Sequence, residues 1–223
     1  MTNLLSMFTR GGISGTIIMV LILICSIIAV AIIVEKFLIL RKARINASHF
    51  IMRVKNLILK DNVEDAIELC SRTEGSLPKV LKKGIAKHHR DKKEVQETIE
   101  GAGREEVYNL EKNLGFLATI SGVAPLLGFL GTVAGMIIAF MEIERLAGNV
   151  NATVLAGGIW TALLTTAFGL SVGIPSYFFY NILLGKVQRI VYDMEVGSSE
   201  IIELLYSEKE DEFKGREQIT HNF

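Results

Sequence analysis

Four threonines could do chemistry because each lies inside a long apolar stretch where few other polar groups are within reach. They are Thr132, Thr161, Thr165 and Thr166. A threonine in a membrane helix often donates its hydroxyl to the carbonyl four residues earlier, and each of the four could be explained in that way. Four hydroxyls in two apolar stretches nevertheless favour a polar lining that could solvate an ion or water. We predict that these residues form an ion pathway.

A group that changes its charge is missing from these stretches. The three apolar stretches of the chain contain no Asp, Glu, Lys, Arg or His, although proton and cation relays normally depend on an ionisable side chain. A partner protein must therefore bring the titrating group, or there is no relay.

Other kinds of chemistry have little support in the sequence. His88 and His89 are adjacent but lack a second pair of ligands, so we predict neither a metal site nor a cofactor. No phosphate loop and no nucleophile–base arrangement is visible, which argues against an enzyme. No aromatic residues interleave a basic face, which argues against nucleic-acid binding. The three apolar stretches do not form an inverted repeat, which disfavours a substrate carrier.

Small residues recur at helical spacing in the same two stretches and let membrane helices approach closely. The predicted packing residues are Gly128, Gly131, Gly135, Gly158, Gly169 and Gly173. A packing stripe without further function stays open. Pro125 and Pro175 are predicted to kink their helices, although tolerated bends without a role are an equal alternative.

The elements that must carry these residues are membrane helices. Half of the residues are hydrophobic, the mean hydropathy is +0.38 and the formal charge is zero. No charged residue occurs over 13–34, 113–141 or 146–185, and about 20 apolar residues suffice to span a bilayer. We predict an all-α membrane protein with transmembrane helices at 13–34, 116–141 and 154–185.

Orientation follows from the basic residues, which gather on the cytoplasmic side of membrane proteins. Of the 24 Lys and Arg residues, 17 lie within 35–112 and 5 within 186–223. The predicted topology has a periplasmic N-terminus (1–12), a cytoplasmic helical region (35–115), a periplasmic loop (142–153) and a cytoplasmic C-terminal helix and tail (186–223). A cleaved signal peptide is disfavoured because the first apolar stretch is too long.

Long helices are predicted to extend from the membrane into the cytoplasm, among them one continuous helix over residues 92–141. The first span, rich in Ile, Val and Leu, is predicted to be a lipid-facing anchor at the outside of the bundle. The basic collar after it, formed by Lys36, Arg41, Lys42 and Arg44, is predicted to meet anionic lipid headgroups of the bilayer. Cys25 and Cys70 would lie in different compartments and cannot pair.

The two later spans resemble the ExbB/TolQ/MotA family of proton-channel subunits, and ExbB and TolQ most closely. The matching residues are 117–120, 123–135, 158–170, Ile174-Pro175 and Tyr180-Asn181, with weaker similarity over 61–84. The resemblance implies a homo-oligomeric ring, thought to be a pentamer, around the single helices of an ExbD- or TolR-like partner that carries a membrane Asp. It also implies that Thr132 and Thr166 face the pore.

The resemblance further implies a motor driven by the proton-motive force in the bacterial inner membrane, which energises TonB-dependent outer-membrane transport through a TonB-like protein. The alternatives are a TolQ-like subunit for outer-membrane integrity, acting with a TolA-like protein, and a passive scaffold for a single-span partner. One departure matters, because Thr161 stands where well-studied relatives have Glu. Neutral oxygens there could suit Na⁺ as well as H⁺, and we expect H⁺.

Overall fold

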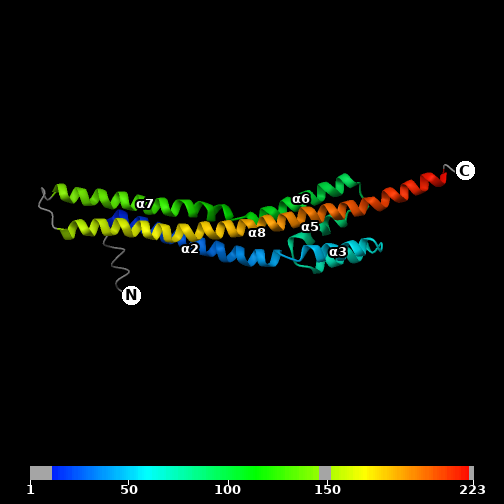
Figure 1. Ribbon diagram of the computed structural model, residues 1–223, viewed down its shortest axis with the longest axis horizontal. Coiled ribbons are helices and arrows are strands. Elements are labelled where there is room, and N and C mark those ends of the chain that lie inside the picture. The colour runs from blue at the N-terminus through cyan, green and yellow to red at the C-terminus, as the bar shows by residue number, and fades with distance from the viewer. Residues whose placement is uncertain (1–11, 146–151, 221–223) are drawn as a thin grey trace. The chain divides into compact units, whose positions relative to one another are not determined.

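The computed structural model describes the backbone of residues 12–145 and 152–220, and that part of the chain is all-helical (Figure 1). The helices are α2 (Gly12–Ala43), α3 (Ala47–Ile58), α4 (Val63–Arg72), α5 (Ser76–Ile85), α6 (Lys92–Glu111), α7 (Leu114–Arg145) and α8 (Ala152–Thr220). They form two compact units. The membrane unit holds residues 1–35 and 113–182, and the polar unit holds residues 36–112 and 183–223.

Two of the predicted segments lie largely outside the described residues. Of the N-terminal segment 1–12 the structure describes only Gly12, and of the 142–153 connection it leaves out residues 146–151.

The described residues contain three helices long and apolar enough to cross a membrane, α2, α7 and α8. Inside a bilayer a helix is favoured because it satisfies its own backbone hydrogen bonds. Large apolar side chains on the outside of these helices are half-exposed or more, as a lipid-facing surface requires. Examples are Ile27, Phe129, Ile137, Leu163 and Ile174.

Helix α2 has one packed side and one exposed side. Met19, Ile22 and Ala29 are buried, whereas Ile17 and Val30 are more than half exposed. The periodicity of burial therefore places α2 at the edge of the membrane unit, with its exposed side available to lipid.

The polar unit has a core of its own, built from amphipathic helices that pack around the second half of α8. Val54, Leu81, Ile85, Val95 and Ile201 are fully buried there. The side chain of Tyr206 on α8 donates a hydrogen bond of 2.7 Å to the carbonyl of Arg90, in the turn before α6. Lys55 on α3 forms an ion pair with Glu200 on α8. These contacts join α8 to α3 and to the turn before α6.

The predicted continuous helix over residues 92–141 is wrong, because the chain breaks between α6 and α7. Asn113 has a φ of 68°, the left-handed conformation that Asn tolerates better than most residues and that commonly ends a helix. Its side-chain amide donates to the Glu35 carboxylate at 3.3 Å. Conversely, α8 runs without interruption through residue 186, where the sequence predicted a separate helix.

Lys36 does not join the basic collar at the lipid headgroups, so that expectation is also wrong. Its side chain is 1 % exposed. The ammonium donates to the carbonyls of Leu110 at 2.9 Å and Asn109 at 3.1 Å. These are among the last carbonyls of α6, which have no partner within the helix and carry its negative dipole end. Lys36 therefore caps the C-terminus of α6.

We expect Lys36→Met to lower the free energy of unfolding by about 2 kcal/mol, because the carbonyls of Asn109 and buried Leu110 lose a charged donor. Thermal unfolding of the purified protein in detergent measures the change. Lys42→Met, at an exposed position of the same helix, serves as the control and should lose much less. An equal loss in both variants would contradict the capping role.

We expect Cys70 to resist alkylation by maleimide at pH 8 in the folded protein. Burial raises the pKa of its thiol from 9.0 to about 12, and the charge of Lys82 offsets only part of this. The thiolate is thus scarce, and the side chain is 3 % exposed. Mass spectrometry after a timed alkylation should show Cys70 modified only after unfolding.

The same raised pKa predicts a loss of stability at high pH. Since the folded pKa lies above the unfolded one, the stabilisation is complete below pH 9 and is lost as the pH rises towards 12. The Cys70→Ala variant should show a shallower decline over that range, measured as the free energy of unfolding against pH. Parallel declines would contradict the assignment.

Candidate functional site

The membrane unit is organised by a seam of small residues along which α7 and α8 pack closely. A Cβ atom added to Gly169 would lie 2.5 Å from the carbonyl oxygen of Ala124 and 2.9 Å from the Cα of Gly128. One added to Gly128 would lie 2.9 Å from the carbonyl oxygen of Thr165. The neighbours are backbone atoms, so the two helices touch along their main chains.

The other predicted packing glycines lie at the same seam. A Cβ built on Gly131 would lie 2.3 Å from Thr165 Oγ1, and one built on Gly135 would lie 3.0 Å from Ala162 Cβ. A Cβ built on Gly158 would lie 2.8 Å from Ala139 Cβ, and one built on Gly173 would lie 2.4 Å from Pro125 Cγ. The six glycines thus share one interface, and its closeness decides which hydroxyls can reach across it.

Thr165 and Thr166 meet at one acceptor, the carbonyl of Gly128. Thr166 donates to it from α8 at 2.9 Å. Thr165 donates to the carbonyl of Ala162 at 2.8 Å and lies 3.4 Å from the Gly128 carbonyl. Thr165 is fully buried, whereas Thr166 is partly exposed. Because glycine has no side chain, its carbonyl is open to hydroxyls from the facing helix.

Thr132 and Thr161 donate within their own helices. The Thr132 hydroxyl donates to the carbonyl of Phe129 at 2.6 Å, and the Thr161 hydroxyl to that of Gly157 at 3.1 Å. Thr161 is 4 % exposed and its methyl carbon lies 3.4 Å from a Cβ built on Gly15 of α2. Thr132 is partly exposed. Within one chain, Thr161 and Thr165 are therefore interior, and Thr132 and Thr166 reach the surface of the membrane unit.

The two prolines differ in their surroundings. Pro125 packs against Gly173 across the seam, whereas Pro175 is exposed. Both lie inside helices that continue past them. The predicted kinks stay a prediction, and the contact with Gly173 gives Pro125 a packing role as well.

The chemistry available at this site is that of neutral oxygens. Each threonine hydroxyl donates a hydrogen bond to a backbone carbonyl. Its oxygen keeps lone pairs that can accept a hydrogen bond from water or coordinate a cation. No side chain of the seam can hold a proton as a charge. Among the described residues, no group of three or more His, Cys, Asp or Glu side chains is placed to hold a metal ion.

Sequence reasoning missed two polar groups of the membrane unit. The first is the Gly128 carbonyl as an acceptor, whose only sequence signal is a glycine facing two adjacent threonines. The second is Ser176, which is 2 % exposed and donates to the carbonyl of Val172 at 2.7 Å. A serine in an apolar helix gives no sign of which neighbour will cover it, so its burial could not be read from spacing.

The site lies within the part of the chain that is similar to known proteins. Residues 72–196, more than half of the chain, match the MotA/TolQ/ExbB proton channel family. A putative biopolymer transport protein ExbB homolog of Methanothermobacter thermautotrophicus is 30% identical over 195 residues, which are 87% of this chain and 67% of that protein.

Two further relatives are similar over shorter stretches. The Tol-Pal system protein TolQ of Haemophilus influenzae is 35% identical over 88 residues, 40% of this chain and 38% of that protein. The biopolymer transport protein ExbB of Aquifex aeolicus is 42% identical over 86 residues, 39% of this chain and 57% of that protein. These shorter matches cover less than two thirds of either relative.

Proposed function

Because the chain belongs to the MotA/TolQ/ExbB proton channel family, we propose that it is the ion-conducting subunit of a motor driven by the proton-motive force. It is a multi-pass inner-membrane protein by its three apolar helices and its family. We further propose that its N-terminus is periplasmic and its C-terminus cytoplasmic, since the basic residues gather in the polar segments.

One observation supports the pathway most directly. The resemblance of this chain to the family implies that Thr132 and Thr166 face the pore. Of the four threonines, these two are the ones that are partly exposed in the single chain. Thr161 and Thr165 are buried against neighbouring helices. In our proposal Thr132 and Thr166 offer their oxygens to the ion, whereas Thr161 and Thr165 support the helices that carry them.

The proposed assembly is a ring of five copies of this chain around an ExbD- or TolR-like single-span partner. The number five is the one that the resemblance implies. The partner's membrane Asp supplies the titrating group that the apolar helices lack. Protonation removes the cost of placing that carboxylate against an apolar wall, so each proton lets the ring and the partner move relative to each other. A TonB-like protein would receive the work, and TonB-dependent transport is the process that we propose is energised.

Two other functions stay possible within the same family. A TolQ-like role in outer-membrane integrity, with a TolA-like protein, is favoured by the similarity to the TolQ of Haemophilus influenzae. A passive scaffold is favoured by the hydroxyls that already donate to carbonyls in the isolated chain. An ion-flux measurement separates the scaffold from the motor.

The test is proton entry into liposomes that contain the chain together with its co-purified single-span partner, at a membrane potential held constant by a potassium gradient. We expect acidification of the interior in sodium-free buffer, and none when the partner's membrane Asp is replaced by Asn. Flux that depends on added Na⁺ would overturn the proton assignment. A correctly assembled complex that shows no proton entry would favour the scaffold.

A further inference from the structure

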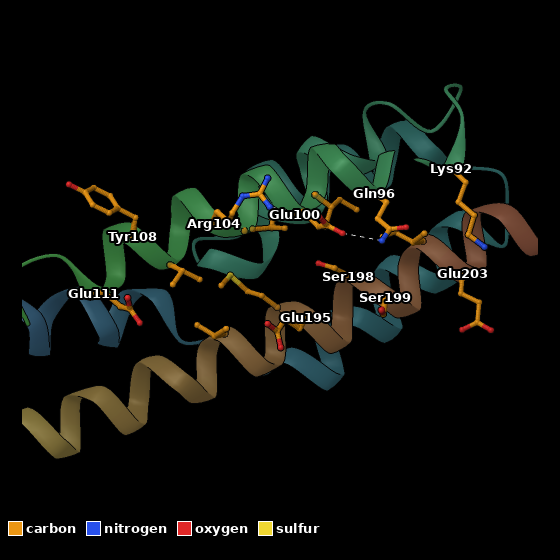
Figure 2. Close-up of a pocket in the computed structure, with 17 residues that line it drawn as sticks. Lys92, Gln96, Glu100, Arg104, Tyr108, Glu111, Glu195, Ser198, Ser199 and Glu203 are labelled. Carbon is orange, nitrogen blue, oxygen red and sulfur yellow. Dashed lines mark hydrogen bonds and ion pairs between the residues drawn. The ribbon is translucent and has the colours of Figure 1, made fainter. Parts of the chain in front are cut away.

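A groove of about 970 Å³ lies in the polar unit, between α6 and the second half of α8 (Figure 2). Its apolar lining comes from both helices, with one residue of α5. These residues are Val80, Ile99, Val107, Val191, Met194 and Ile202. The side chains labelled in Figure 2 follow the groove along both helices, from Glu111 and Tyr108 to Lys92 and Glu203. This groove has no part in the ion pathway proposed above.

A buried hydroxyl in the groove has no partner. Ser198 on α8 is 5 % exposed, and its Oγ forms no hydrogen bond with any described residue. The residue lines the groove, and Figure 2 draws its hydroxyl on the side of α8 that faces α6. A buried polar group without a hydrogen bond costs free energy. A polar group of a bound molecule would remove that cost.

A glycine in the wall of the groove has open space at its Cβ position among the described residues. Gly103 lies inside α6, where glycine disfavours the helix, and a Cβ built on it would have nothing within 4 Å. It lines the groove. Glycine in a helix lets another backbone approach closely, so an external segment crossing α6 at Gly103 would give the residue a role.

The rim of the groove is acidic. Four glutamates line it, with Lys92 and Arg104 as the basic residues. Arg104 pairs with Glu100 at 3.8 Å. The other three, Glu111, Glu195 and Glu203, form no ion pair among the residues that the structure describes. Carboxylates spread along an apolar groove favour an occupant with Lys or Arg beside an apolar stripe.

The described polar unit of a second copy has no long stripe of large exposed apolar residues that would fill this groove. The large exposed apolar residues there are Phe37, Leu38, Met52, Leu59, Tyr108, Tyr192 and Val196. At helical spacing they give pairs, Met52 with Leu59 and Tyr192 with Val196, and no longer stripe. The groove follows α6 from Lys92 to Glu111, about 30 Å at 1.5 Å per residue, which is several turns longer than such a pair.

We propose that this groove binds a basic, amphipathic helix of about five turns from another protein, with its apolar stripe crossing α6 at Gly103 and its cations facing the acidic rim. This mode places an apolar helix face into a groove and fixes its direction by charge. The inference goes beyond ion conduction and does not rest on it.

The probe for the test is a fluorescent 18-residue helix of Leu, Ala and Lys with leucine on one face, added to the full chain in detergent. Anisotropy should report saturable binding. Gly103→Leu fills the groove and should weaken binding about tenfold or more, which is the scale of one good apolar contact. Gly101→Leu is the matched control, because its Cβ also has nothing within 4 Å and Gly101 does not line the groove. We expect its affinity to stay within about twofold of wild type.

Detergent partition of the peptide is the same for wild type and variants, so the difference between them reports on the groove. A matched peptide with Glu in place of Lys should not bind, and Glu195→Lys together with Glu203→Lys should weaken the basic peptide. Equal binding of both peptides, or equal loss in Gly101→Leu and Gly103→Leu, overturns the proposal. No peptide binding, with an oligomer mass that falls in Gly103→Leu, overturns it too and assigns the groove to contacts between copies. None of these results bears on proton flux, so this inference and the proposed function can fail separately.

Discussion

Gly169→Val will prevent α7 and α8 from packing closely, and we expect this variant to lose about 3 kcal/mol of stability. The new Cβ would lie 2.5 Å from the carbonyl oxygen of Ala124 and 2.9 Å from the Cα of Gly128. Both are backbone atoms in the middle of a helix and cannot swing aside as a flexible side chain can. The only relief is to separate the helices, which removes the close contacts that hold a membrane bundle together.

Thermal unfolding of the purified protein in detergent measures this effect, with the yield of monodisperse protein as a second readout. Gly157→Val is the matched control, because it lies on the same helix and an added Cβ has nothing within 4 Å. We expect the control to remain within about 0.5 kcal/mol of wild type. If Gly157→Val were as damaging as Gly169→Val, the loss would come from valine in this helix and not from the seam.

The seam is the part of the candidate site that spacing alone could place. Gly128 and Gly135 lie seven residues apart on α7, and Gly158, Gly169 and Gly173 follow one another at helical intervals on α8. Spacing of this kind fixes which residues share a face of a helix. It does not fix the register between two helices, so it could not predict that Gly128 would offer its carbonyl to a threonine of α8.

The division of the four threonines was invisible for the same reason. All four lie in apolar helices and look alike in the sequence. Burial of Thr161 depends on α2 approaching at Gly15, and burial of Thr165 depends on the absent side chain of Gly131. Both facts arise from packing between distant segments, so the sequence predicted a set of hydroxyls and could not say which of them reach the surface.

The errors in the predicted fold come from a few residues. Leu110 and Leu114 are both buried, so the apolar stripe passes unbroken through the junction of α6 and α7. The break depends on the backbone of two adjacent residues, Lys112 with a ψ of 136° and Asn113 with a φ of 68°. The prediction that Lys36 meets lipid headgroups failed for another reason. A lysine just beyond a membrane span normally faces the headgroups. Here the end of α6, more than 70 residues later, supplies two carbonyls that bury it.

The largest functional effect should come from Thr132→Val, which we expect to lower proton flux about tenfold or more while the complex still assembles. The Thr132 hydroxyl donates its hydrogen to Phe129, so what it offers an ion is the lone pairs of its oxygen. Valine keeps the shape and removes that oxygen. A proton or hydrated cation crossing an apolar wall then loses one of few ligands, and about 1.4 kcal/mol added to the barrier is a tenfold loss of rate.

Thr119→Val separates this effect from a general change in helix α7. Thr119 lies on the same helix, is exposed and donates its hydroxyl to the carbonyl of Gly115 at 2.9 Å, so the variant removes the same kind of hydrogen bond. We expect Thr119→Val to conduct like wild type, in liposomes where the amount of assembled complex is matched by size-exclusion chromatography. Normal flux in Thr132→Val would remove this oxygen from the pathway. A common loss in the two variants would mean that valine disturbs the helix, because only a hydroxyl that touches the ion should distinguish position 132 from position 119.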